Sequence, residues 1–125
     1  MKLRDHLRVP WVLEACSLEG PGGEWTNRVS YPELGDCAVE GKSIEAIMDE
    51  IERLRARTIL DRLRRGIVVR SPRAPDESVD PGETLARLGL IAEFEDLLDL
   101  DEADLRIASS DRGGKPEDGE DAARG

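Results

Sequence analysis

The amino-acid sequence predicts an α+β domain in which an antiparallel sheet carries one long helix across a face, in the order βββαβ. Three features predict this class: period-two polarity at residues 25–31, a long helical pattern at 44–65, and short strand-forming runs on either side. The chain has 125 residues, enough for one compact domain. We expect that domain at residues 1–75, a linker and acidic helical segment at 76–108, and a disordered tail at 109–125.

Three predicted strands open the chain, at residues 9–18, 25–31 and 37–40. The first two are separated by a Gly-Pro-Gly-Gly run, the strongest turn signal in the sequence. In the second strand Trp25, Asn27, Val29 and Tyr31 share one parity, which indicates a strand with one buried face. Strands joined by links this short favour an antiparallel meander.

The helix at residues 44–65 is the most regular predicted element. Ser43 stands at the N-cap position, and Gly66 follows the last turn as a helix stop. One stripe of the helix carries Ile47, Ile51 and Leu54, and we expect these residues to form a core with Trp25, Val29 and Tyr31. A second apolar patch near the basic end consists of Ala56, Leu60 and Leu63.

Residues 67–70 are apolar and β-branched, and they predict a return to the sheet as a fourth strand. A four-stranded sheet with one covering helix leaves its other face and its edges open, which predicts a homodimer. After this strand, Asp80 and Pro81 form a typical helix start. That helix is expected to be interrupted at Gly89 and to continue toward Leu98.

Charge is distributed unevenly along the chain. The net charge is -10, of which residues 1–75 contribute +1 and residues 76–125 contribute -11. A negative net charge and few aromatic residues argue against nucleic-acid binding. No apolar run approaches the length of a membrane span, and the N-terminus lacks the apolar core of a secretory signal. We therefore expect a cytoplasmic protein.

Catalytic and metal-binding patterns are missing from the sequence. Two cysteines and one histidine do not supply the ligands of a structural zinc site, and no glycine-rich phosphate loop or nucleophile elbow occurs. The paired carboxylates fall in predicted helices, where solvated charge is their usual role. The prediction is a protein that is not an enzyme and has no cofactor or metal.

Residues 22–51 carry a resemblance to a known family. The motifs are PELGDC at residues 32–37, EGKS at 40–43 and a helix opening with IEAI at 44–47. In this arrangement the chain resembles the HicB-like antitoxin family. The resemblance implies a partial RNase H-like βββαβ fold, and it implies binding to a small basic toxin nuclease, HicA, whose active site is occluded. The C-terminal DNA-binding domain usual in related antitoxins is not recognisable here.

The sequence therefore predicts a non-enzymatic protein-binding module, acting as a HicB-like antitoxin or as an orphan adaptor. Two alternatives are a dimeric DNA-binding regulator that uses its arginine-rich helix ends, and an accessory subunit of an enzyme complex. The candidate partner-binding residues lie on the acidic segment and on the basic end of the long helix. They are Phe94, Leu97, Leu98, Leu100, Asp101 and Glu102, together with Arg57, Leu60, Leu63 and Arg64.

The acidic segment around these residues has three possible roles. Its leucines and carboxylates suit docking on the basic end of the chain's own helix, where Leu60 and Leu63 offer matching apolar surface. They equally suit docking on a basic partner such as a toxin nuclease. The third alternative is a segment that is merely solvated.

Overall fold

The computed structural model of the chain describes residues 1–113, with side chains described as far as residue 107. An antiparallel sheet contains β1 (Glu14–Glu19), β2 (Trp25–Tyr31) and β3 (Cys37–Gly41), with β2 in the centre. Val29 of β2 lies opposite Ala15 of β1 and Val39 of β3. The predicted α+β class and antiparallel meander are confirmed, although β1 begins later than expected. The short 3-10 helix η1 (Pro32–Leu34) joins β2 to β3.

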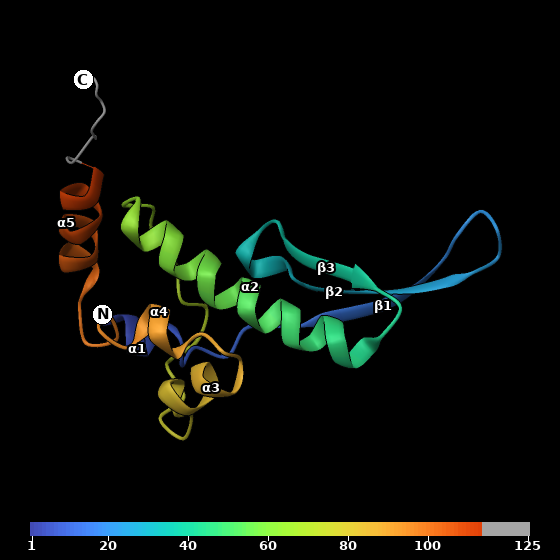
Figure 1. The fold of residues 1–125 in the computed structure, drawn as a ribbon, viewed down its shortest axis with the longest axis horizontal. Helices are drawn as coiled ribbons and strands as arrows, with labels where there is room; N and C mark the ends of the chain where they lie inside the picture. Colours follow the sequence, from blue (N-terminus) through green and yellow to red (C-terminus); the bar gives the residue numbers. More distant parts are fainter. Residues whose placement is uncertain (114–125) are drawn as a thin grey trace.

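Helix α2 (Ile44–Arg64) crosses one face of the sheet (Figure 1). The Ser43 hydroxyl accepts a hydrogen bond from the N–H of Ala46 at 3.2 Å, which satisfies one of the unpaired donors of the first turn. At the other end Gly66 adopts a left-handed φ of 73°, a conformation that glycine adopts without steric strain. Both predicted end signals are confirmed.

The core between sheet and helix is formed by Val29, Tyr31, Ile47 and Ile51, all buried, with Leu54 packed at its margin. The predicted core is confirmed for these residues and wrong for Trp25, whose side chain is 61% exposed. Trp25 lies at the start of β2, opposite Glu19 at the end of β1. This part of the hairpin extends past the N-terminal end of α2, so no helix covers the indole (Figure 1).

The predicted fourth strand is wrong, because residues 67–70 form no strand. Helix α2 has 21 residues. At about 1.5 Å per residue it spans roughly 30 Å, more than the strands it crosses, so the chain leaves the helix beyond the sheet. The following residues run back along the N-terminal segment, where Arg73 donates to the carbonyl of Pro10 at 2.9 Å and pairs with Glu33 at 3.0 Å.

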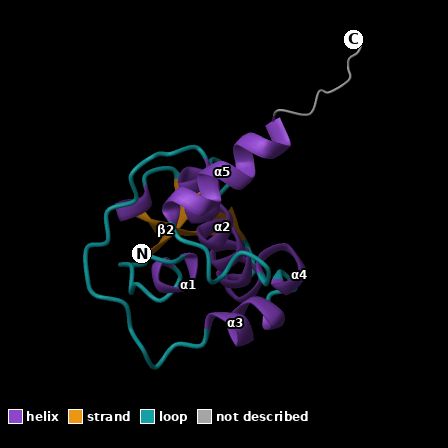
Figure 2. Ribbon diagram, turned by 90° about the vertical axis from the view of Figure 1, so that its left-hand side faces the viewer, coloured by secondary structure: helices purple, strands orange, loops and turns teal. Residues whose placement is uncertain are grey.

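Four further helices gather round the C-terminal half of α2 (Figure 2). They are α1 (Leu3–His6), α3 (Pro81–Arg87), α4 (Ile91–Phe94) and α5 (Glu102–Gly113). The predicted start of α3 is confirmed, since the Asp80 carboxylate accepts hydrogen bonds from the N–H groups of Gly82 and Glu83. The expected break at Gly89 is also confirmed, by its positive φ of 77°.

Buried residues from both 1–75 and 76–108 belong to one continuous core. The C-terminal helix α5 continues to Gly113, past residue 109 where disorder was expected to begin. The remainder of that expected tail, 114–125, lies outside the described residues. The acidic segment is thus part of the domain's own packing.

Candidate protein-interaction surface

The least covered part of the fold is strand β1. All six of its residues are exposed, whereas the central strand β2 carries two buried side chains. Figure 1 shows the β1–β2 hairpin reaching out beyond the N-terminal end of α2. We define the β1 surface as residues 14–19 together with Trp25.

The backbone of β1 is open along one side. Among the described residues β1 pairs only with β2, so its outer edge presents N–H and C=O groups that no neighbouring strand satisfies. Such an edge is a template for pairing with another extended chain. Glu14 and Glu19 stand at the two ends of the strand, and the residues between them are uncharged.

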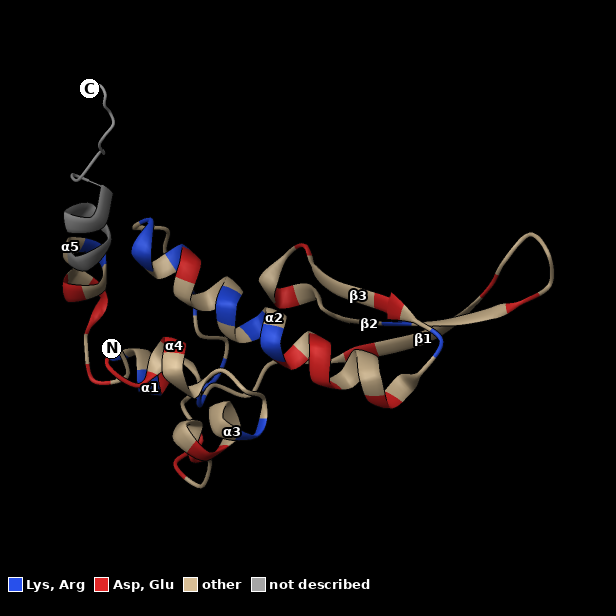
Figure 3. Cartoon of the chain, in the orientation of Figure 1, with Lys and Arg blue, Asp and Glu red and all other residues tan. Residues whose placement is uncertain are grey.

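The electrostatic character of the β1 surface is acidic (Figure 3). Within residues 1–113 neither Glu14 nor Glu19 forms an ion pair, while Arg28 of β2 is paired with Glu40 of β3 at 3.0 Å. The neighbouring cation is thus already partly compensated by its own carboxylate. An acidic strand edge favours an extended segment that carries lysine or arginine.

Apolar and reactive groups are also exposed here. Leu18 is 40% exposed and Trp25 is 61% exposed. Tryptophan side chains of this kind often contribute most of the binding energy of a protein interface. A shallow hollow of about 340 Å³ on the strand pair is lined by Glu14, Ala15, Cys16, Arg28 and Ser30. Cys16 is exposed, whereas Cys37 is buried and its burial raises the pKa of its thiol.

The apolar residues predicted to bind a partner lie elsewhere, inside the chain's own core. Other parts of this chain cover all of them. Phe94, Leu97, Leu98, Leu60 and Leu63 are all buried, and Leu100 packs against them at the margin. These residues are therefore not exposed anchors in this structure, and their arrangement is that of the internal-docking alternative.

The charged members of that predicted set are engaged within the chain as well. Arg57 pairs with Glu93 of α4 at 2.6 Å. Glu102 lies 2.7 Å from the imidazole of His6, and Asp101 accepts the N–H of Asp104 at the start of α5. Arg64 lies in the last turn of α2. The structure brings the acidic segment onto the rest of the domain through these pairs.

Sequence reasoning missed the β1 surface, although one signal was present. Residues 14–19 read Glu-Ala-Cys-Ser-Leu-Glu, which lacks the regular apolar alternation of a strand with one buried face. That irregularity fits a strand that no helix covers. The sequence does not show that α2 begins too late along the sheet to reach the hairpin.

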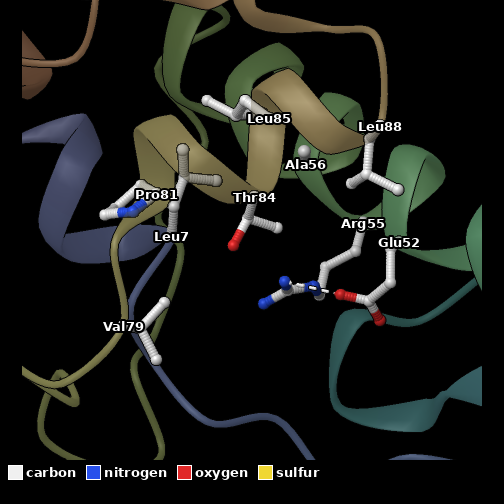
Figure 4. A pocket seen from close by; sticks show the side chains of 9 residues that line it. All are labelled: Leu7, Glu52, Arg55, Ala56, Val79, Pro81, Thr84, Leu85 and Leu88. Carbon is white, nitrogen blue, oxygen red and sulfur yellow. Dashed lines mark hydrogen bonds and ion pairs between the residues drawn. The ribbon is translucent and has the colours of Figure 1, made fainter.

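A small cavity lies where α1, α2 and α3 meet (Figure 4). Its volume is about 20 Å³, room for a single water molecule. Arg55 points toward it and is held by Glu52 at 2.7 Å, while Glu52 also accepts the hydroxyl of Tyr31. Burial, followed by this hydrogen bond to Glu52, raises the pKa of Tyr31 well above its ordinary value. This partly buried polar cluster links β2 to α2.

Metal-ligating side chains do not cluster in the described part of the chain. Within it no group of three or more histidine, cysteine, aspartate or glutamate side chains could hold a metal ion. Its single histidine, His6, is buried against Glu102. No helix within residues 1–113 is both long and apolar enough to cross a membrane.

Comparison of the chain with protein-family models, with curated proteins and with solved structures finds no match. The β1 surface is therefore the feature of this chain that bears on its function.

Proposed function

We propose that this chain is a non-enzymatic protein-binding module that holds an extended, basic segment of another protein along β1. The observation that carries the proposal is the wholly exposed edge strand with a glutamate at each end. Added strands gain affinity from main-chain hydrogen bonds, and the side chains beside them supply specificity. Trp25 and Leu18 supply apolar contacts beside the edge.

This proposal includes the role of a HicB-like antitoxin or an orphan adaptor in the cytoplasm. An antitoxin of this kind occludes the active site of a small basic nuclease, and an acidic edge strand suits such a partner. An adaptor uses the same surface to recruit its partner without inhibiting it. The two roles share the binding step and differ only in its consequence.

The arginines of α2 favour protein binding over the DNA-binding alternative. Arg53 donates to the carbonyl of Leu88 at 2.9 Å, and Arg62 donates to the carbonyl of Leu34 at 2.6 Å. Arg55 and Arg57 are paired with glutamates. Side chains committed to such internal contacts are poorly placed to neutralise phosphates, which is the main source of affinity for DNA.

The proposal is tested by affinity capture from cells that make this protein, using the wild-type chain and two charge variants. The test variant carries Glu14→Arg and Glu19→Arg. The control carries Glu50→Arg and Glu95→Arg, which makes the same change of net charge at two exposed positions away from β1. We expect the wild type and the control to retain the same basic protein, with binding that weakens as salt increases.

Loss of that protein in the β1 variant supports the β1 surface as its binding site. Equal retention by the β1 variant, or no specific capture by the wild type, would overturn the proposal. Where the captured protein cleaves RNA, adding the purified chain separates the two roles: an antitoxin stops the cleavage, and an adaptor leaves it unchanged.

A further inference from the structure

The β1–β2 hairpin and the C-terminus of α2 lie toward opposite ends of the long axis of the molecule (Figure 1), and each carries exposed apolar side chains. At the hairpin end are Leu18 and Trp25. At the other end Ile67 and Val68 follow the C-terminus of α2, beside a cavity of about 70 Å³ that Glu102 and Arg106 of α5 also line. Val68 is 76% exposed, more than any other large apolar side chain of the described region.

The residues around Val68 have the composition of a strand and no strand partner. Ile67 donates its N–H to the carbonyl of Arg62 at 2.8 Å, which closes the end of α2. From Val68 to Arg70, no backbone hydrogen bond is made to any part of residues 1–113. A β-branched run with free backbone groups readily adds to an open sheet edge.

The charges flanking this run complement those of β1. Arg65 and Arg70 are separated by the same number of positions as Glu14 and Glu19. Arg65 is well exposed and keeps only a surface pair with Asp61 at 3.3 Å. Opposite charges directly across a strand pair stabilise it, which applies to Glu14 and Arg70. Arg65 caps α2 outside the extended run and adds a second positive charge near its start.

We propose that a second copy of this chain supplies this run, so that β1 of each copy pairs with residues 67–70 of the other. The inference concerns the same β1 surface as the proposed function, and the second copy competes there with a basic segment of another protein because β1 has a single open edge. β1 and residues 67–70 lie toward opposite ends of the molecule (Figure 1). Two antiparallel copies related by a two-fold axis therefore form both contacts at once.

The charges select the register of this pairing. Antiparallel pairing is the more stable kind per residue. With Glu14 opposite Arg70, Cys16 lies opposite Val68. Glu19, at the other end of β1, then lies on the side of Arg65, which caps α2 and is outside the paired run. Val68, exposed in the monomer, becomes covered next to Leu18.

Light scattering at micromolar concentration tests the dimer. The wild-type chain is expected at twice its mass of 13.8 kDa. Val68→Asp places a carboxylate against the acidic strand and is expected to give a monomer. Because the side chain of Val68 is exposed, its replacement leaves the fold intact, which circular dichroism and the melting temperature verify. Arg87→Glu, at an exposed position on α3, is the control and is expected to remain dimeric.

Charge exchange tests which residues face each other. Glu14→Arg and Arg70→Glu are each expected to raise the dimer dissociation constant about tenfold, since each change acts at two equivalent contacts. Combining the two changes in one chain restores the opposite charges and is expected to return the constant to near its wild-type value. A photo-cross-linker on Cys16 of the purified protein is expected to mark residues 67–70 of the other copy.

A wild-type monomer at this concentration, a dimer that Val68→Asp leaves intact, or cross-links from Cys16 to β1 of the other copy would each overturn the inference. Its failure is distinguishable from failure of the proposed function. A monomer that still captures a basic protein through β1 removes only the homodimer, whereas a dimer of this kind that captures no other protein removes only the proposed function.

Discussion

The Nε2 atom of His6 lies 2.7 Å from the Oε2 atom of Glu102, and this hydrogen bond joins the first helix of the chain to the last described one. Two backbone hydrogen bonds reinforce the junction, from Leu3 to Leu100 and from Arg4 to Leu98, both at 2.9 Å. The N-terminal turn and the acidic segment therefore pack together, and the leucines of that segment, Leu97 and Leu98, are buried in the domain.

Glu102→Ala is expected to destabilise the protein by about 1–3 kcal/mol, because it leaves a buried imidazole without a hydrogen-bond partner. His6 is only 1% exposed, so water does not readily replace the lost carboxylate. Chemical denaturation measures the change in the free energy of unfolding. Asp99→Ala is the matched control, since it removes the exposed Arg4–Asp99 pair at the same junction and is expected to change stability by less than about 1 kcal/mol. Equal effects of the two changes would contradict the structural role of His6.

Phe94→Ala is expected to cost about 3–5 kcal/mol of stability, since its ring is fully buried and truncation leaves a cavity. Deletion of residues 94–125 is expected to lower the melting temperature and to increase binding of a hydrophobic dye. The control is Ile107→Ala on α5, whose side chain is 59% exposed. A truncated chain that melts like the full chain would show that the acidic segment is not part of the core.

Ile51→Ala tests the packing of sheet on helix. Ile51 is fully buried between α2 and the sheet, and its truncation is expected to cost about 2–5 kcal/mol. Ile44→Ala, in the first turn of the same helix, removes the same atoms from a side chain that is 45% exposed and is expected to have a much smaller effect. Equilibrium unfolding in urea compares the two. A loss below about 1 kcal/mol for Ile51→Ala would contradict this core.

Ionisation of Tyr31 is expected to lower the stability of the fold at alkaline pH, and ultraviolet absorbance measures this ionisation. It is the single tyrosine of the chain, so phenolate absorbance reports on it alone. Burial and the hydrogen bond to Glu52 raise its pKa in the folded state above the ordinary value of 10.0. The raised pKa contributes stability that is fully present below about pH 10 and is lost as pH rises above that value.

We therefore expect no phenolate in the folded chain near pH 10, and ordinary titration near that pH in strong denaturant. Tyr31→Phe is expected to remove this tyrosine-linked part of the alkaline loss of stability. Phenolate formation near pH 10 without unfolding would contradict the buried position of the hydroxyl.

Local signals in the sequence predicted the regular elements well. A capping serine, a stop glycine and a stripe of isoleucines are short-range features, and they suffice to place α2 and its buried face. The pair of Asp80 and Pro81 likewise places the start of α3. Such features depend on neighbouring residues and hardly at all on distant packing.

Predicting the interaction surface requires contacts between residues that are far apart in the sequence. The leucines of the acidic segment were predicted as partner anchors, yet they are buried in the chain's own core. Apolar surface gains the same stabilisation from burial against its own chain as against another. The β1 surface became visible only once the position of α2 along the sheet was known. Trp25 is exposed for the same reason, although its parity matches that of the buried Val29.

The sequence by itself determined the α+β class, the meander, the limits of α2 and the capped start of α3, since each follows from periodicity or from caps that act within a few residues. Tertiary structure decided the fate of residues 67–70, the internal docking of the acidic segment and the exposure of β1. These depend on where α2 lies along the sheet and on which apolar faces pack against each other. Neither quantity is encoded in a local pattern, because both arise from contacts between residues far apart in the chain.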